Sequence, residues 1–157
     1  MASLYPAIRV HDPIEDHDLD ETAYEQCRKL ISESPDLVGI YVTTENSTPV
    51  INAARDAGLV GKLTIVTTDL FPALVKEIRA GSVTATIYQR PRTQGRMAFR
   101  VLHEFLIEGE YPSQNVTFAP HLVMRGNLEF FLQRVSVESR STKTRTGTGI
   151  RKQTAKL

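Results

Sequence analysis

Short apolar runs rich in Val, Ile and Tyr alternate along the chain with longer segments whose apolar residues recur at helical spacing. The short runs predict five strands, at Ala7–Val10, Leu37–Val42, Leu63–Thr67, Val83–Tyr88 and Val116–Ala119, the last extending toward Met124. The run Leu37–Val42 reads LVGIYV and is apolar on both faces. Such a run is typical of a parallel sheet that is covered on both sides.

The segments between these runs predict four helices with recognisable ends. Asp18 or Asp20 is the candidate N-cap of the first helix, which continues to about Ser34, and Ser47 or Thr48 is the candidate N-cap of the second. In the second, Pro49 occupies the first turn and Gly58 follows the end. The remaining two cover Leu70–Ala80 and Thr93–Glu108, ended by Gly81 and Gly109. This alternation predicts an α/β fold: a three-layer αβα arrangement with a mainly parallel sheet of about five strands.

The helix predicted at Thr93–Glu108 has an unusually wide apolar surface. Its apolar residues are Met97, Ala98, Phe99, Val101, Leu102, Phe105, Leu106 and Ile107. On the pattern alone, two interpretations stay open. The helix is either buried in the core of the chain or packed against a surface outside it.

The 157 residues correspond to about one domain, and the net charge of +1 conceals an asymmetry. Residues 139–157 hold six basic and no acidic residues, so residues 1–138 carry a net charge of −5. We expect the basic segment 136–157 to be a disordered tail, with contact to nucleic acid as the alternative. No apolar run is long enough to span a bilayer and no signal peptide is visible, so no membrane partner is expected. The single cysteine, Cys27, excludes an internal disulfide.

Polar side chains follow each predicted strand at the end where ligands bind in open parallel sheets. His17 and Asp18 lie in the loop after the first strand, and Asn46, Asp69 and Gln89 follow the second, third and fourth. Carboxylate and amide groups exchange paired hydrogen bonds with polyols. Each residue alone is also explained as a turn or cap residue, and Asp69 in particular is positioned to cap the helix that follows it.

Catalytic and metal-binding signatures are weak, so we expect no enzyme activity, no catalytic residue, no cofactor and no metal site. The sequence has no P-loop, no G-x-S-x-G and no zinc-ligand spacing among its four histidines. An alternative from a different class is a phosphoacceptor receiver domain, since Asp12 and Asp69 follow the first and third strands. That class needs a lysine after the fifth strand, where this chain reads Phe118-Ala119-Pro120-His121-Leu122.

Several of these motifs occur together in one known family. The run from Pro35 to Glu110 resembles the second half of a type I periplasmic-binding-protein fold, and more narrowly the sugar-sensing domain of lactose-repressor-family transcription regulators. The features that match are Asn46 after one strand, Thr68-Asp69 after the next, the block Gln89, Pro91, Gly95 and Ala98, and the closing pattern from Pro120 to Leu128. The resemblance extends over about residues 5–132.

The resemblance implies roles for single residues. Asn46 and Asp69 match positions that bind sugar hydroxyls, and Gln89 matches a ligand contact at the hinge crossing. His17 and Asp18 match a loop that often contributes a ligand contact, although this chain lacks an aromatic residue there. The implied ligand is a small carbohydrate.

The resemblance also implies that residues 1–135 form the C-terminal lobe of a two-lobed clamp, in which residues 90–112 cross to the other lobe. A regulator of this family binds operator DNA through a headpiece that is not recognisable here, and it is cytoplasmic. The alternative is the matching lobe of a transporter-associated sugar-binding protein. Without the second lobe, we expect the Thr93–Glu108 helix to form a homodimer and the isolated lobe to bind sugar weakly or not at all.

Overall fold

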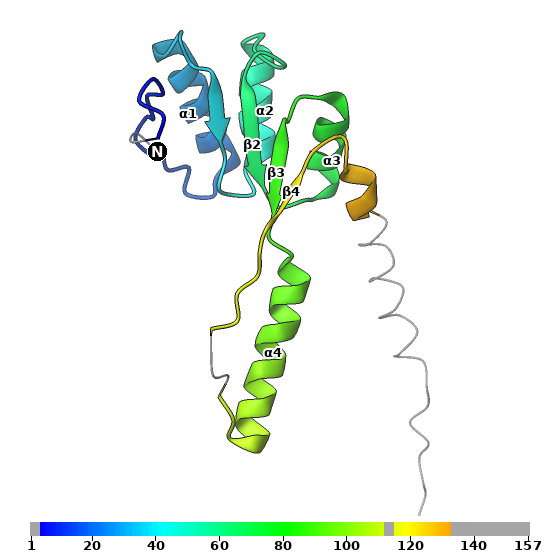
Figure 1. The fold of residues 1–157 in the computed structure, drawn as a ribbon. Coiled ribbons are helices and arrows are strands. Elements are labelled where there is room, and N and C mark those ends of the chain that lie inside the picture. The colour runs from blue at the N-terminus through cyan, green and yellow to red at the C-terminus, as the bar shows by residue number, and fades with distance from the viewer. Residues whose placement is uncertain (1–3, 112–114, 133–157) are drawn as a thin grey trace, which may run out of the picture.

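The computed structural model describes residues 4–111 and 115–132, and these form an α/β lobe from which one long helix extends (Figure 1). The elements in chain order are α1 (Asp20–Glu33), β1 (Gly39–Tyr41), α2 (Ser47–Asp56), β2 (Thr64–Thr68), α3 (Pro72–Ala80), β3 (Ala85–Tyr88), α4 (Pro91–Glu108) and β4 (His121–Val123). The predicted α/β class is confirmed. The tail predicted at 136–157 lies outside the described residues.

The four strands form one sheet in the order β1-β2-β3-β4. The first three are parallel, with Tyr41 opposite Val66 and Thr67 opposite Thr86, whereas β4 runs antiparallel to β3. The prediction of a mainly parallel sheet is therefore confirmed, with four strands in place of about five. Because parallel strands end at the same edge, the loops after β1, β2 and β3 share one side of the lobe.

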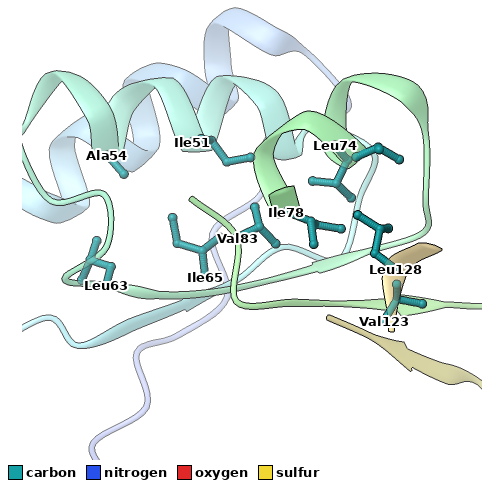
Figure 2. Close-up of a cluster of buried hydrophobic side chains, with 10 residues drawn as sticks. Ile51, Ala54, Leu63, Ile65, Leu74, Ile78, Val83, Val123 and Leu128 are labelled. Atoms are coloured by element: carbon teal, nitrogen blue, oxygen red, sulfur yellow. The ribbon is translucent and has the colours of Figure 1, made fainter. Parts of the chain in front are cut away.

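The main core lies between one face of the sheet and helices α2 and α3 (Figure 2). Its buried members are Ile51, Ala54, Leu63, Ile65, Leu74, Val75, Ile78, Val83, Val123 and Leu128. A second cluster joins α1 to α2 through Ala23, Cys27, Val42, Val50 and Ala53. Burying each of the larger side chains contributes about 1.5–3 kcal/mol, so these two clusters hold the lobe together.

The opposite face of the sheet is less covered. Strand alternation places Tyr41 and Leu122 on the face away from Ile65 and Val123, and both are more than half exposed. Among the residues that the structure describes, no helix covers them, so the third layer stays a prediction.

Two of the predicted strands are wrong. Residues 7–10 are exposed and pair with no strand, and Arg9 instead forms a solvent-exposed ion pair with Asp36 at 3.2 Å. Residues 116–119 are also unpaired, and the last strand begins at His121, directly after Pro120. Proline has no amide hydrogen to donate to a ladder, which is consistent with pairing that starts after it. Pairing also requires a neighbouring strand, which a local pattern does not supply.

The helix predictions are close to the structure. Helices α1 and α2 begin at Asp20 and Ser47, and α3 and α4 each begin two residues from the predicted start. The capping predictions for α1 and α2 are wrong, because their N-caps are Leu19 and Asn46 and neither makes a side-chain capping hydrogen bond. Gly81 and Gly109 end α3 and α4 in the left-handed conformation, with φ of 82° and 70°, as glycine permits without steric cost. None of the described helices is both long enough and apolar enough to cross a membrane.

Leu74 is fully buried whereas Leu4 is 77% exposed, which gives a matched test of the core. We expect Leu74→Ala to lower the free energy of unfolding by about 2–5 kcal/mol, because it removes buried methyl groups and leaves a cavity. Leu4→Ala should change it by less than about 0.5 kcal/mol. Urea denaturation measures both, and equal effects would contradict this core.

Cys27 gives a pH-dependent test, because burial raises the pKa of its thiol from 9.0 to about 11. The thiol also contacts the carbonyl oxygen of Val50 at 3.7 Å. A raised thiol pKa stabilises the fold fully below pH 9, and this contribution is lost as the pH rises toward 11. At pH 9 we expect iodoacetamide to modify the native chain at least about tenfold more slowly than the urea-unfolded chain. Equal rates would show that Cys27 is not buried between α1 and α2.

Candidate binding site

The candidate site is the edge of the sheet where β1, β2 and β3 end. Asp69 directly follows β2, Gln89 directly follows β3, and Asn46 lies in the loop after β1, at the start of α2. The parallel ladder brings these three sequence-predicted residues to one side of the lobe. The Thr68 hydroxyl donates to the carbonyl oxygen of Val42 at 3.0 Å and ties the ends of the first two strands together.

Asp69 has a left-handed backbone, with φ of 65°. Its amide donates to the carbonyl of Ile87 at 2.9 Å, and its own carbonyl accepts from the Thr86 hydroxyl. Its side-chain Oδ1 accepts from the amide of Gln89 at 3.3 Å. These three bonds hold a conformation that costs a non-glycine residue about 1–2 kcal/mol.

The capping interpretation of Asp69 is wrong. The N-cap of α3 is Phe71, and no side chain makes a capping hydrogen bond there. Asp69 instead links the end of β2 to the end of β3, and its carboxylate lies half-buried at the edge of the sheet. Of the two carboxylate oxygens, Oδ2 has no recorded partner among the described residues. A fixed carboxylate with an unused oxygen is suited to accept hydrogen bonds from a ligand.

Gln89 marks the point where the chain leaves the sheet for α4. Its side chain is exposed, and its carbonyl accepts from Gln94 Nε2 at 2.6 Å. Arg90 follows in the left-handed conformation, and its guanidinium lies 5.9 Å from the ring centre of Phe118 on the returning segment. The two passages of the chain between the lobe and α4 are therefore in contact beside Gln89.

Asn46 is buried and its amide contacts the loop before α1, not the open edge. In one amide orientation, Nδ2 donates to Asp16 Oδ2 at 3.3 Å. In the reversed orientation, the nitrogen donates to Asp20 Oδ1 and the oxygen accepts from the Leu19 amide, both at 3.2 Å. Either way, Asn46 fastens this loop to the end of β1.

Asp16 lies in the loop after the first predicted strand but is not among the ligand-binding residues predicted from the sequence. Its Oδ2 accepts from the Thr44 hydroxyl at 3.1 Å and, in one orientation of the Asn46 amide, from Asn46, and its Oδ1 accepts from the Asp18 amide at 3.0 Å. The local signal was present, since an aspartate two residues before a turn residue is typical of an Asx-turn. Its long-range contact with Thr44 had no local signal.

His17 and Asp18 form the tip of the same loop, with left-handed φ of 52° and 56°. Both are exposed, and the recorded side-chain contact of His17 is with Glu15, at 3.8 Å. The structure thus brings their loop to Asn46, but it records no contact of either side chain with Asn46, Asp69 or Gln89. Whether they bind ligand stays a prediction.

The site is rich in acceptors but holds no metal-binding arrangement. Within residues 4–111 and 115–132, no group of three or more His, Cys, Asp or Glu side chains is positioned to hold a metal ion. The phosphoacceptor alternative therefore lacks the acidic pocket that it requires around Asp69 in the described structure. Neutral hydroxyl groups are the ligand chemistry that fits fixed carboxylate and amide groups.

The importance of Asp16 can be tested against Asp12, an exposed residue of the same loop with no recorded partner. We expect Asp16→Ala to lower the free energy of unfolding by about 1–3 kcal/mol, because the Thr44 hydroxyl and the Asp18 amide lose their acceptor. Faster amide hydrogen exchange at residues 17–19 should accompany it. Asp12→Ala should change neither quantity, and equal effects would contradict this role.

Comparison with known proteins gives one family and several structural relatives. A family model described as "Periplasmic binding protein domain" matches residues 1–110. The chain is 28% identical, over 81 residues, to the D-allose-binding periplasmic protein of Escherichia coli strain K12, covering 51% of this chain and 26% of that protein.

Two solved structures show the same fold. One is the fructose binding periplasmic domain of a hybrid two component system, with a TM-score of 0.77 and 19% identity over 92% of this chain and 49% of that one. The other is a periplasmic solute binding protein of an ABC transporter from Actinobacillus succinogenes 130z, with bound D-allose. It has a TM-score of 0.70 and 22% identity over 79% of this chain and 43% of that one. The chain thus spans about a quarter of the curated relative and less than half of each structure.

Proposed function

This chain belongs to the periplasmic binding protein domain family, and on that premise we propose that it supplies one side of a binding site for a small carbohydrate. The observation that carries the proposal is the carboxylate of Asp69. It is fixed beside Gln89 at the carboxyl edge of a parallel sheet, with one oxygen unused among the described residues. That edge is where ligands bind in open α/β sheets.

The chemistry of the edge suits neutral hydroxyl groups. An ionised carboxylate accepts hydrogen bonds from hydroxyls, and the exposed amide of Gln89 both donates and accepts. A hydrogen bond to a charged group contributes about 1.5–3 kcal/mol, so Asp69 is the strongest single contact of this half-site. Asn46 has an indirect role in this proposal: its amide holds in place the loop that carries Asp16, His17 and Asp18.

We propose that the other side of the site belongs to a second lobe. The relatives are about twice as long as this chain or longer, and Asp69 and Gln89 supply contacts from one direction only. With one side of the cleft, the affinity of this chain for sugar should be low. The proposed activity is binding, in keeping with relatives that are named as binding proteins.

The finer proposal is the ligand-sensing part of a cytoplasmic transcription regulator of the lactose-repressor family. Sugar bound between the lobes would favour the closed state and change operator binding by a DNA-binding headpiece. Support for it is the motif combination Asn46, Thr68-Asp69 and Gln89 with the closing pattern from Pro120. A lobe of a transporter-associated binding protein fits the same site equally well. The upstream coding sequence decides between them, since a helix-turn-helix indicates the regulator and a signal peptide the transporter protein.

Sugar binding at the edge can be tested by NMR. We expect D-allose, D-fructose and myo-inositol, titrated separately to about 100 mM, to include at least one ligand that binds in the millimolar range. Amide shifts should concentrate at residues 44–46, 69–70 and 89–90. Asp69→Asn should weaken that binding at least about tenfold, because it removes the charged acceptor.

Asp36→Asn is the matched control, because Asp36 lies just before β1, at the opposite end of the strand from the site, where it pairs with Arg9. It should leave the affinity unchanged. Shifts that spread over the lobe without saturation, or equal losses in both variants, would contradict the proposed site.

A further inference from the structure

Helix α4 stands apart from the lobe (Figure 1). Its 18 residues include no buried side chain, although eight of them are apolar side chains of the sequence-predicted wide face. The interpretation of α4 as a core helix is therefore wrong within the described part of the chain. Nothing in that part shows what covers this face, whereas inside the lobe both backbone groups of Asp69 have a defined partner.

Three different groups of Asp69 are held by the end of β3 and the residue that follows it. The amide donates to the Ile87 carbonyl at 2.9 Å, the carbonyl accepts from the Thr86 hydroxyl, and the carboxylate accepts from the Gln89 amide at 3.3 Å. The first bond restrains φ, the second restrains ψ, and the third restrains the side chain. Together they hold Asp69 in the left-handed region, which residues with a Cβ generally avoid.

Thr86 contributes the one bond of these three that a side chain donates. Its side chain is fully buried, and its place in β3 is fixed by pairing with Thr67 of β2 and with Val123 of β4. A buried hydroxyl that loses its partner is costly, and a β-branched side chain has few rotamers. The Thr86 hydroxyl therefore holds the Asp69 carbonyl from a rigid position inside the sheet.

We propose that Thr86 is a positioning residue for the carboxylate of Asp69. Without the hydroxyl, the Asp69 carbonyl is free to turn, the residue leaves its left-handed conformation, and the carboxylate moves away from the Gln89 amide. A ligand then has to order Asp69 on binding, which lowers the affinity. Thr86 has no exposed surface, so it affects a ligand only through Asp69. The effect on affinity rests on the proposed function, sugar binding at the sheet edge.

The neighbouring strand offers a matched control. Thr67 of β2 is the register partner of Thr86, and both side chains are fully buried. The Thr67 hydroxyl has no hydrogen-bond partner among the described residues. A change from threonine to valine keeps the shape of the side chain and replaces the hydroxyl by a methyl group. At Thr86 this change removes a bond to Asp69, and at Thr67 it removes no bond within the described chain.

The first measurement needs no ligand, because hydrogen exchange of the Asp69 and Gln89 amides reports their two bonds in the full 157-residue chain. We expect Thr86→Val to speed exchange at both amides at least about tenfold, relative to the amide of the buried core residue Ile78. The coupling between the amide and α protons of Asp69 should also change, since it depends on φ. Thr67→Val should leave these quantities unchanged.

The second measurement is the affinity for the sugars, titrated by NMR as for Asp69→Asn. Thr86→Val should raise the dissociation constant at least about fivefold, and Thr67→Val should leave it within about twofold. Thr86→Ser keeps the hydroxyl and loses a methyl group, so it should retain both the affinity and the slow exchange. A role in packing alone predicts the reverse order, with serine worse than valine. Circular dichroism checks that every variant is folded.

Equal effects of valine at Thr86 and at Thr67, unchanged exchange in Thr86→Val, or a Thr86→Ser variant that behaves like Thr86→Val would each overturn the positioning role. Sugar binding that Asp69→Asn weakens but Thr86→Val does not would also overturn it, while the proposed function stands. If the chain binds none of the three sugars, the proposed function fails, and the exchange rates at Asp69 and Gln89 alone decide the role of Thr86.

Discussion

The parallel pairing of β1, β2 and β3 is the constraint on which the rest of this structure depends. Parallel strands all end at one edge, and the crossovers between them place α2 and α3 on the same face of the sheet. One set of backbone hydrogen bonds therefore fixes both the core and the candidate site. In β2, the alternate residues Ile65 and Thr67 are fully buried on the core side of the sheet. The same strand ends at Thr68, directly before Asp69 of the candidate site.

Backbone strain is concentrated near that same edge. Among the described residues, the four non-glycine residues with positive φ are His17, Asp18, Asp69 and Arg90. Each lies in a loop that contacts the ends of the parallel strands or leads out of them. A strained backbone conformation persists where surrounding contacts hold it in place. At Asp69, three hydrogen bonds hold the left-handed conformation. Strain confined to one side of a lobe is consistent with a binding role for that side.

The junction between the lobe and α4 lies beside the candidate site. The chain leaves through Gln89 and Arg90 and returns through Phe118, and the Arg90 guanidinium lies over the Phe118 ring. The antiparallel direction of β4 follows from this return. Helix α4 begins at Pro91, so it follows Gln89 of the candidate site after a single residue.

The sequence by itself determined the α/β class, the four helices and the placement of Asn46, Asp69 and Gln89 after successive strands. Helical periodicity and terminal glycines such as Gly81 and Gly109 are local signals, and parallel strands necessarily end together. The tertiary structure alone decided which apolar runs become strands, because residues 7–10 and 116–119 find no pairing partner there. It also decided that Asp69 bonds to Gln89 instead of capping α3, and that the Asn46 amide turns toward residues 16–20. These outcomes depend on hydrogen bonds between residues 20 and 30 positions apart, which no local pattern encodes.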